Sequence, residues 1–477
     1  MPRPLLVMKF GGTSVGSASA IRSAADLVAR RAGSHRLAVV VSAMSRVTDL
    51  ILSTLEAAER GNAAEVDEGI GRLRTTHEAA CRALVPPDRA TRVLARIEGI
   101  LDRLARVARG MLLLRERPPR AVDDAAPTGE RLSALLLAET LRESGIPAAS
   151  VAGSALIVTD ATAAGAKPFL EETAENCGAV LGPLLAEGSV PVITGYGAAA
   201  RDGTPTTLGR GGSDFSAAII AASLQAHELW IWTDVDGILS CDPRIDLEAR
   251  LLREVTYNEA AELAYNGAKV LHPRTLAPLA DRRIPVRIRN SFRPDGPGTR
   301  ITGRHTARPG VRAITSLSQV ALVSIEATGL SLSGAQLMAR ALAVAARAQV
   351  EVLLMTRSSF RQNFCMLVRS GDVEPVVEGL REELAIELAH GYMLPIAVDH
   401  SVGLLAAVGE GMRGTPGLAG RLFTALSERN VNIIAIAQGS SELTIAIVVN
   451  ATDLRTSVSA IHSECGLGRP ARTPAAH

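Results

Sequence analysis

Short β-branched runs alternate with Ala- and Leu-rich stretches through residues 1–303 of the chain. The runs at 5–8, 37–41, 148–151, 190–194, 228–233 and 285–288 predict strands, and the stretches between them predict helices. This alternation is typical of an α/β domain with a mainly parallel sheet. Because such sheets bind ligands at the carboxyl ends of their strands, we expect functional residues in the turns that follow the strands.

The overall composition excludes several classes of function. The chain has 477 residues, more than one ordinary core accommodates, so several domains are expected. A net charge of +2, without blocks of like charge, gives no support for nucleic acid or an anionic membrane as a partner. No apolar run is long enough for a membrane span or a signal sequence. The five cysteines are scattered without a metal or redox motif, so a cytoplasmic location is expected.

An internal repeat occupies the C-terminal part of the chain. Its matching residues lie 81 positions apart: Val350 with Val431, Arg357 with Gln438 and Val368 with Val449. Two copies at this spacing indicate a duplicated small domain rather than a solenoid. We therefore expect a large domain at 1–303, a linker at 304–319, and two small domains at 320–395 and 396–470.

A glycine turn follows the first predicted strand, where residues 9–14 read Lys-Phe-Gly-Gly-Thr-Ser. Gly11 and Gly12 allow backbone N–H groups to approach an anion, and the N-terminus of the next helix favours negative charge. Lys9 would stabilise a phosphoryl group during its transfer. The 51 basic residues include three lysines, Lys9, Lys167 and Lys269, which favours a functional reason for keeping an ammonium there. The alternative is an ordinary strand–turn–helix corner.

A second glycine turn covers residues 208–214, Leu-Gly-Arg-Gly-Gly-Ser-Asp, and again leads into a predicted helix. Arg210 is suited to a bidentate grip on a substrate carboxylate. Asp214 could orient Lys9, a metal or a proton. Each turn alone is a weak signal, but two such turns between strand and helix are harder to explain as ordinary corners.

A third polar turn, with Thr233, Asp234 and Asp236, follows the strand predicted at 228–233. Its start resembles a calcium loop, but the later ligands of such a loop are missing. A loop that holds the ribose and phosphates of a nucleotide, with Arg244 near the phosphates, fits better. Lys269 is either a further nucleotide ligand or an ordinary solvated lysine.

Glu130 stands at the start of a long Leu- and Ala-rich helix. It could be a favourable acidic residue in the first helical turn, or it could receive a substrate ammonium. Ser42, Ser45 and Thr48 lie after the strand at 37–41 and could bind the same small ligand.

Several of these segments together resemble the motifs of aspartokinases. The resemblance is carried, in order, by the runs at 9–15, 209–214, 232–237, 242–244, 267–273 and 290–299. It implies an α/β chain with the amino-acid-kinase three-layer fold and a mainly parallel sheet, followed by two ferredoxin-like α+β ACT domains. The implied reaction is phosphate transfer from Mg-ATP to the side-chain carboxylate of L-aspartate, the first step of the aspartate-derived amino-acid pathway that leads to lysine and threonine, among others.

The resemblance also implies roles for individual residues. Lys9 would stabilise the transferring phosphate, with Asp214 as its organiser, and Arg210 and Glu130 would hold the α-carboxylate and the ammonium of aspartate. The other residues implied for the aspartate pocket are Ser42, Thr48, Tyr196 and Ser213. Those implied for ATP are Lys9, Gly11, Gly12, Thr233, Asp234, Asp236, Arg244 and Lys269. Magnesium is expected through the ATP phosphates rather than at a dedicated protein site.

The repeat implies regulation by an amino acid. The run at 430–442, with Asn432 and Gln438, resembles the effector turn of threonine-sensitive aspartokinases, whereas Arg357 stands in the first copy where Gln438 stands in the second. Gly417, at a predicted helix start, could meet the carboxylate of an effector. The alternative is a pair of purely structural ACT domains without a ligand. The expected effector is threonine or lysine. A homodimer or higher oligomer is expected through the ACT domains, because each would be a half-covered sheet that needs a partner. Since the sequence ends at residue 477, no homoserine dehydrogenase domain is expected.

Two alternatives stay open at this point. A kinase of the same fold could act on glutamate, acetylglutamate or carbamate, but such enzymes lack the two-ACT tail. A non-catalytic amino-acid-binding regulator of the same fold predicts damage at Lys9, Asp214 or Lys269, and all three residues are intact.

Overall fold

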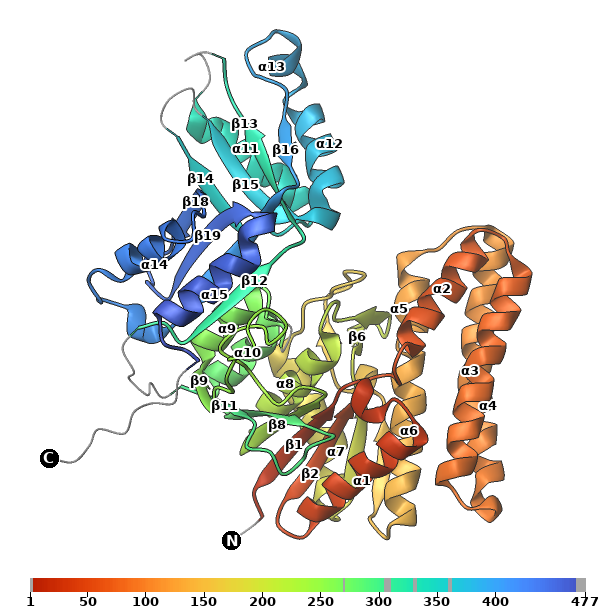
Figure 1. The fold of residues 1–477 in the computed structure, drawn as a ribbon. Helices are drawn as coiled ribbons and strands as arrows, with labels where there is room; N and C mark the ends of the chain where they lie inside the picture. Colours follow the sequence, from red (N-terminus) through yellow and green to blue (C-terminus); the bar gives the residue numbers. More distant parts are fainter. Residues whose placement is uncertain (1–2, 269–270, 304–309, 329–332, 359–362, 469–477) are drawn as a thin grey trace, which may run out of the picture. The chain divides into compact units, whose positions relative to one another are not determined.

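The computed structural model describes residues 3–268, 271–303, 310–328, 333–358 and 363–468 (Figure 1). The chain divides into two compact units. The first comprises Met1–Ile238, Arg253–Tyr257 and Val270–Arg304, and the second comprises Leu239–Leu252, Asn258–Lys269 and His305–His477. Within the described ranges, every helix is too short or too polar to span a lipid bilayer.

An eight-stranded sheet forms the centre of the first unit, in the order β3-β5-β2-β1-β8-β10-β11-β9. Neighbouring strands run parallel from β3 to β10, and β11 pairs antiparallel with β10, so the expected mainly parallel sheet is confirmed. The strands are β1 (Leu5–Phe10), β2 (Arg36–Val41), β3 (Ala148–Val151), β5 (Val190–Thr194), β8 (Glu228–Thr233), β9 (Glu254–Thr256), β10 (Val286–Asn290) and β11 (Thr299–Thr302). The central strand β1 is buried along its whole length, as expected for a parallel strand covered on both faces.

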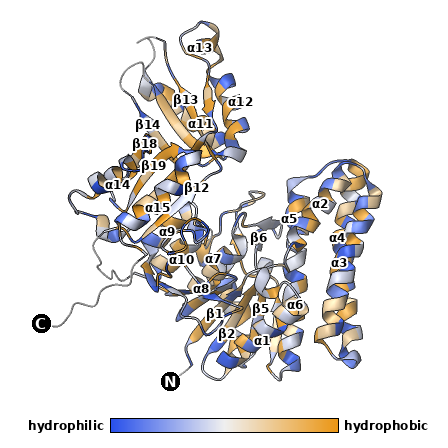
Figure 2. Ribbon diagram, in the orientation of Figure 1, coloured by the Kyte–Doolittle hydropathy of each residue, from blue (hydrophilic) through white to orange (hydrophobic). Residues whose placement is uncertain are grey.

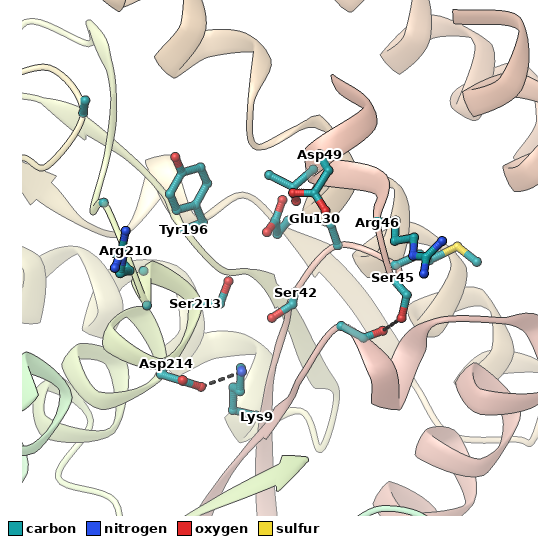
Figure 3. Close-up of a pocket in the computed structure, with 18 residues that line it drawn as sticks. Lys9, Ser42, Ser45, Arg46, Asp49, Glu130, Tyr196, Arg210, Ser213 and Asp214 are labelled. Carbon is teal, nitrogen blue, oxygen red and sulfur yellow. Dashed lines mark hydrogen bonds and ion pairs between the residues drawn. The ribbon is translucent and has the colours of Figure 1, made fainter. Parts of the chain in front are cut away.

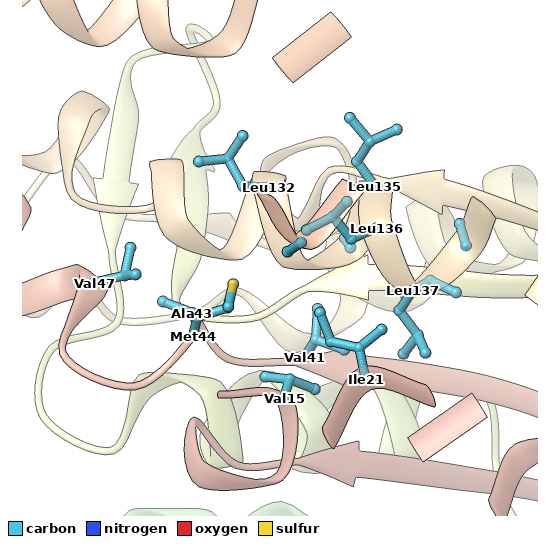
Figure 4. Close-up of a cluster of buried hydrophobic side chains, with 14 of the residues drawn as sticks. Val15, Ile21, Val41, Ala43, Met44, Val47, Leu132, Leu135, Leu136 and Leu137 are labelled. Carbon is cyan, nitrogen blue, oxygen red and sulfur yellow. The ribbon is translucent and has the colours of Figure 1, made fainter. Parts of the chain in front are cut away.

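Helices cover both faces of this sheet and give three layers (Figure 1). One group packs together on one side and consists of α1 (Ala18–Ala32) and α6 (Thr128–Glu143). The other group consists of α7 (Leu170–Ala186), α8 (Gly212–Ser223) and α10 (Pro273–Asp281). Apolar side chains of α6, such as Leu136, meet residues of β2 and its following turn in the largest core cluster (Figure 4).

A helical extension packs against α6 in the same unit. Its members are α2 (Val47–Glu59), α3 (Ala63–Leu84), α4 (Pro87–Leu114) and the short α5 (Pro119–Ala125). Hydrophilic and hydrophobic residues alternate along α3 and α4 (Figure 2), which is the pattern of helices with one buried face. A small separate sheet lies in the order β4-β6-β7 and consists of β4 (Val158–Thr159), β6 (Gly197–Ala200) and β7 (Pro205–Thr207).

The second unit contains two modules of similar topology. The first has the four-stranded order β14-β15-β13-β16, in which neighbours are antiparallel. It is built from β13 (Val320–Ile325), α11 (Gly334–Arg347), β14 (Leu354–Arg357), β15 (Phe364–Arg369), α12 (Val373–Glu383), α13 (Ala385–Ala389) and β16 (Ala397–Asp399). This βαββαβ arrangement is ferredoxin-like.

The second module takes one of its strands from an earlier part of the chain. Its sheet has the order β12-β17-β19-β18, and β12 pairs antiparallel with β17. Its elements are β12 (Ala313–Leu317), β17 (Val402–Val408), α14 (Leu418–Ser427), β18 (Ile433–Gln438), β19 (Thr444–Asn450) and α15 (Leu454–Glu464). Part of the segment expected to be a linker therefore forms an outer strand of this sheet. The same unit also holds most of α9 (Tyr257–Tyr265).

The helix-free faces of the two small sheets pack against each other. On β13, Val320 and Leu322 contact this inter-sheet cluster, whereas the alternate residues Ala321 and Val323 face the module's own helices. Residues of β17 and β19, such as Leu404, complete the cluster. The homodimer was expected because each small sheet has one face that needs to be covered. The packing of the two small sheets already covers part of that surface within one chain.

Candidate active site

A cavity of about 560 Å³ opens at the carboxyl ends of β1 and β2 in the first unit (Figure 3). Five segments line it: β1 with its glycine turn, the turn and helix start at 42–49, the start of α6, the loop at residue 164 and the segment around 196–214. The structure brings together ten residues singled out from the sequence: Lys9, Gly12, Ser42, Ser45, Thr48, Glu130, Tyr196, Arg210, Ser213 and Asp214.

Lys9 and Asp214 form an ion pair at one end of this cavity. Lys9 Nζ lies 2.5 Å from Asp214 Oδ1, and the two side chains are 8% and 18% exposed (Figure 3). The strand β1 places Lys9 between β2 and β8, and Asp214 lies in the first turn of α8, where the helix dipole favours a carboxylate. A largely buried ammonium with one fixed carboxylate partner can stabilise added negative charge more strongly than a solvated lysine can.

The turn before α8 presents Arg210 to the cavity. Gly211 begins the helix with φ of 71°, and a Cβ atom at this position would lie 2.7 Å from His272 Cβ, so both conformation and space require glycine. Arg210 is exposed and has no ion-pair partner among the described residues. Its guanidinium is therefore available to an anionic ligand.

Glu130 is a buried carboxyl group in the wall of the cavity. Its side chain is 4% exposed, and Oε2 has no hydrogen-bond partner in the described part of the chain. Burial raises the pKa of Glu130 to about 7, while the N–H groups of Glu130 and Ala43 and the charge of Lys9 act in the opposite direction. A cation bound beside this carboxyl group would lower its pKa and favour the ionised form.

Two residues near the pocket adopt left-handed backbone conformations. Tyr196 has φ of 69°; its N–H donates to Ser216 Oγ at 3.0 Å, and its carbonyl accepts from Leu208 N at 3.0 Å. Burial raises the pKa of its phenol. Arg46, with φ of 63°, ends the turn before α2.

Sequence analysis missed five residues that line the cavity: Ala43, Met44, Arg46, Asp49 and Ala164. Asp49 follows Thr48 in the first turn of α2, so its place beside an already proposed residue was an available signal. Ala164 carries no chemical group that a motif search would select.

The residues proposed for ATP are less completely assembled. Gly12 lines the cavity, whereas Gly11 does not; the N–H of Gly11 donates to Trp232 O at 3.0 Å. Thr233 ends β8, which neighbours β1, and Asp234 and Asp236 follow it, but these three residues do not line this cavity. Asp236 accepts a hydrogen bond from Asn290 Nδ2 at 2.8 Å and pairs with an arginine, Arg293, at 2.8 Å.

Arg244 and Lys269 stay predictions. Arg244 belongs to the second unit, where its guanidinium pairs with Asp242 at 2.6 Å and its carbonyl accepts from Arg455 of α15 at 2.7 Å. Lys269 lies outside the described residues. The segment around Arg244 is also held by Ser240, whose Oγ lies 2.9 Å from Nε2 of the buried His462.

The proposed effector residues all lie in the second module. Gly417 begins α14 with φ of 78°, and Asn432 and Gln438 are exposed at the start and end of the β18 region. Arg357 ends β14 as Gln438 ends β18, so the structure places the two residues paired by the sequence repeat at equivalent strand positions.

Comparison with known proteins defines the class first. Residues 4–290 match the model of the amino acid kinase family, and residues 405–465 match that of an ACT domain, so this is an amino acid kinase domain joined to an ACT domain. Bifunctional aspartokinase/homoserine dehydrogenase 1 of Arabidopsis thaliana is 35% identical over 97% of this chain and 51% of its own length. Schizosaccharomyces pombe aspartokinase is 31% identical over 96% of this chain and 92% of its own. The chain belongs to the aspartokinase family.

Solved structures agree with this assignment. Escherichia coli aspartokinase III in complex with aspartate and ADP matches with a TM-score of 0.81 and 29% identity, covering 96% of this chain and 99% of that one. The same enzyme in complex with lysine and aspartate matches with a TM-score of 0.79 and 30% identity, covering 97% and 99%. The expected fold class, an amino-acid-kinase fold followed by ACT structure, is confirmed. The chain spans about half the length of the bifunctional relatives that it matches.

Proposed function

We propose that the protein is an aspartate kinase, which transfers the terminal phosphate of Mg-ATP to the side-chain carboxylate of L-aspartate and gives 4-phospho-L-aspartate and ADP. The observation that carries the proposal is the composition of a single cavity. The Lys9–Asp214 ion pair shares that cavity with the unpaired guanidinium of Arg210 and the buried carboxyl group of Glu130.

The charges of L-aspartate match these groups. Arg210 suits the α-carboxylate, because a guanidinium binds a carboxylate through two parallel hydrogen bonds. Glu130 suits the ammonium, which would donate a hydrogen bond to Oε2, an atom without such a partner in the described part of the chain, and would favour the ionised carboxylate. The side-chain carboxylate is then left for the Lys9 end of the cavity. The remaining walls of the aspartate pocket are supplied by Ser42, Thr48, Tyr196 and Ser213.

The proposed chemistry needs positioning and charge stabilisation rather than a general base. One oxygen of the ionised carboxylate attacks the γ-phosphorus, and the bond from that phosphorus to the ADP oxygen breaks, so no proton has to move. Lys9 stabilises the charge on the transferring phosphoryl oxygens, and Asp214 keeps the ammonium in place.

We assign ATP to the glycine turn of Gly11 and Gly12 and to the neighbouring loop with Thr233, Asp234 and Asp236. The support is that β1 and β8 are adjacent parallel strands, so both turns follow the same edge of the sheet. Magnesium, which is usually held by phosphates, water and one or two carboxylates, would neutralise phosphate charge there. The oxygen donors of Asp214 and Asp234 suit that ion. We also propose that the protein is cytoplasmic, because ATP and aspartate are available in the cytoplasm.

The reaction can be tested with purified protein, Mg-ATP and L-aspartate in the presence of hydroxylamine, which traps an acyl phosphate as a hydroxamate. We expect a hydroxamate that depends on L-aspartate and is lost in Lys9→Ala. Product no greater than that of Lys9→Ala would reject the kinase and favour the non-catalytic regulator.

We also propose feedback control by threonine or lysine at the second module. The support is the ACT match and the left-handed N-cap Gly417, with Asn432 and Gln438 in the same module. Thermal shift and inhibition should respond to one of these amino acids, and Gln438→Ala should weaken the response without changing activity in its absence. A flat response to every amino acid of the aspartate-derived pathway would reject this proposal.

A homodimer through the ACT modules is proposed as well. The outer strand β18 exposes Ile434 and Ile436, which are 36% and 41% accessible, and exposed apolar residues on an outer strand favour association. Ultracentrifugation should give a dimer or a larger oligomer, and Ile436→Glu should weaken it. A monomeric wild-type protein at micromolar concentration would contradict the proposal.

A further inference from the structure

A buried carboxylate outside the proposed catalytic group lies behind the aspartate pocket. Asp123, near the end of α5, is 3% exposed. Burial raises its pKa, and hydrogen bonds from Thr207 and Ala164 act in the opposite direction. A buried charge is costly unless it is hydrogen-bonded. The hydrogen-bond donors of Asp123 therefore indicate its role.

Those partners connect two walls of the cavity. Thr207 Oγ1 donates to Asp123 Oδ1 at 2.6 Å, and Ala164 N donates to Oδ2 at 3.1 Å and to Oδ1 at 3.3 Å. Ala164 lines the cavity, and Thr207 ends β7 two residues before the glycine turn that carries Arg210. One carboxylate therefore ties the loop at 160–167 to the start of the Arg210 turn.

The loop at 160–167 has few other restraints that place it over the pocket. Asp160 closes its base by accepting from Lys167 N at 3.0 Å, and Ala166 N donates to Thr207 O at 2.9 Å. At its tip Ala164 has φ of 58°, a conformation that alanine rarely adopts without a fixed partner. The bond from Ala164 N to Asp123 supplies that partner.

The tip of this loop rests on the Arg210 turn. Gly209 has φ of 73°, and a Cβ atom there would lie 3.3 Å from both Ala164 O and Gly165 Cα. The backbone around Ala164 and the backbone beside Arg210 are thus in close contact. A shift of one would displace the other.

We propose that Asp123 is a positioning residue for the aspartate pocket: it holds the 160–167 loop against the Gly209–Asp214 turn and so sets the direction of Arg210. This inference rests on the proposed aspartate site. It predicts that Asp123 governs the binding of the amino acid and not that of the nucleotide.

An asparagine has the same size as Asp123 but weakens both of its contacts. The amide oxygen of Asp123→Asn can accept from the N–H of Ala164, and its NH2 group then faces Thr207 Oγ1, which as a hydroxyl can accept instead of donate. The variant therefore replaces two hydrogen bonds to a charged carboxylate by weaker neutral ones and reverses the direction of the bond with Thr207. The link between the two walls is weakened at constant side-chain size.

The test measures steady-state kinetics of Asp123→Asn. We expect the KM for L-aspartate to rise about tenfold, because two buried hydrogen bonds lose their charged acceptor, while the KM for ATP stays within about twofold. Hydrogen exchange at residues 160–167 should be faster in the variant. An unchanged KM for L-aspartate, or an equal rise in both KM values, would overturn the proposal.

The chain offers a matched control and a second variant. Asp202 also accepts a backbone N–H, from Thr204 at 2.9 Å, but in an exposed turn, so Asp202→Asn should leave both KM values unchanged. If Asp123→Asn does not fold, Thr207→Val removes one donor at nearly constant shape. That variant should raise the KM for L-aspartate at least about threefold, and no rise would overturn the proposal.

A binding measurement separates this inference from the kinase proposal. If the wild-type protein forms no acyl phosphate, the kinase proposal fails, yet calorimetry still reports its affinity for L-aspartate. Weaker binding of L-aspartate by Asp123→Asn than by Asp202→Asn would then support the positioning role. Equal binding by the two variants would reject it.

Discussion

The pKa of Glu130 predicts how aspartate binding depends on pH. Burial raises this pKa to about 7, and the ionised form is the one that attracts an ammonium. With this value, about one tenth of the molecules carry the charge at pH 6 and about nine tenths at pH 8. Because affinity scales with the fraction of molecules in which Glu130 is ionised, the Kd for L-aspartate should be about tenfold higher at pH 6 than at pH 8.

Isothermal titration calorimetry of L-aspartate at pH 6, 7 and 8 is the direct assay. Near pH 7 binding should also release about half a proton, which buffers of different ionisation enthalpy reveal. Glu130→Gln should bind more weakly and lose the pH dependence, and succinate, which lacks the ammonium, should not show the same preference for high pH. A flat affinity in the wild-type protein, or the same slope in Glu130→Gln, would refute the reasoning.

The same carboxyl group should influence stability in the absence of ligand. A folded-state pKa raised above the ordinary value of 4.5 contributes stability that is fully present below that value and is lost as pH rises through about 7. The full contribution is about 3 kcal/mol for a shift of this size. The melting temperature of the free protein should therefore fall between pH 5 and 8, and L-aspartate should restore most of the loss at pH 8.

Three further substitutions have defined expectations. Lys9→Ala should lower kcat at least about a hundredfold with little change in the KM for ATP, because Lys9 acts mainly on the phosphoryl group in transfer; a change in KM alone would contradict that role. Arg210→Lys should raise the KM for L-aspartate about tenfold through loss of bidentate geometry, whereas Arg201→Lys, at an exposed pair with a glutamate, should have no effect. Burial lowers the pKa of His462, so the stability that its neutral form contributes is present above about pH 6.5 and is lost as pH falls. The melting temperature of His462→Gln should therefore depend less on acid pH than that of the wild-type protein. The same pH profile in both proteins would refute this role of His462.

The parts of the site that were predictable from the sequence carry their chemistry in local segments. Lys9 ends a strand just before a glycine turn, and Arg210 and Asp214 lie in such a turn and at the start of the helix after it, so the parallel-sheet rule predicts that they meet at one edge. Glu130 follows the same logic at a helix start, although its raised pKa depends on tertiary burial that no local pattern shows.

Other features depend on contacts between distant parts of the chain. Ala164 enters the cavity because Asp123 accepts its N–H, 41 residues away, and neither residue belongs to a recognisable motif. The pairing of β12 with β17 likewise joins segments separated by the whole first module, whereas the sequence around β12 is rich in linker-like residues. Such pairings are decided by packing, because strand propensity says little about the partner.

The antiparallel pairing of β12 with β17 makes these two strands the arms of a β-hairpin, with Leu317 opposite Leu404 near its tip. The first module is therefore an insertion in the turn of that hairpin, and residues 318–401 could in principle be replaced by a two- to five-residue loop of ordinary hairpin type. The reverse operation is not equivalent: a chain that stops after β16 keeps the complete sheet of the first module but leaves β12 without its partner. During synthesis β12 leaves the ribosome before the inserted module and β17 leaves it afterwards, so the inserted module can fold before the sheet that contains β12 and β17 is complete.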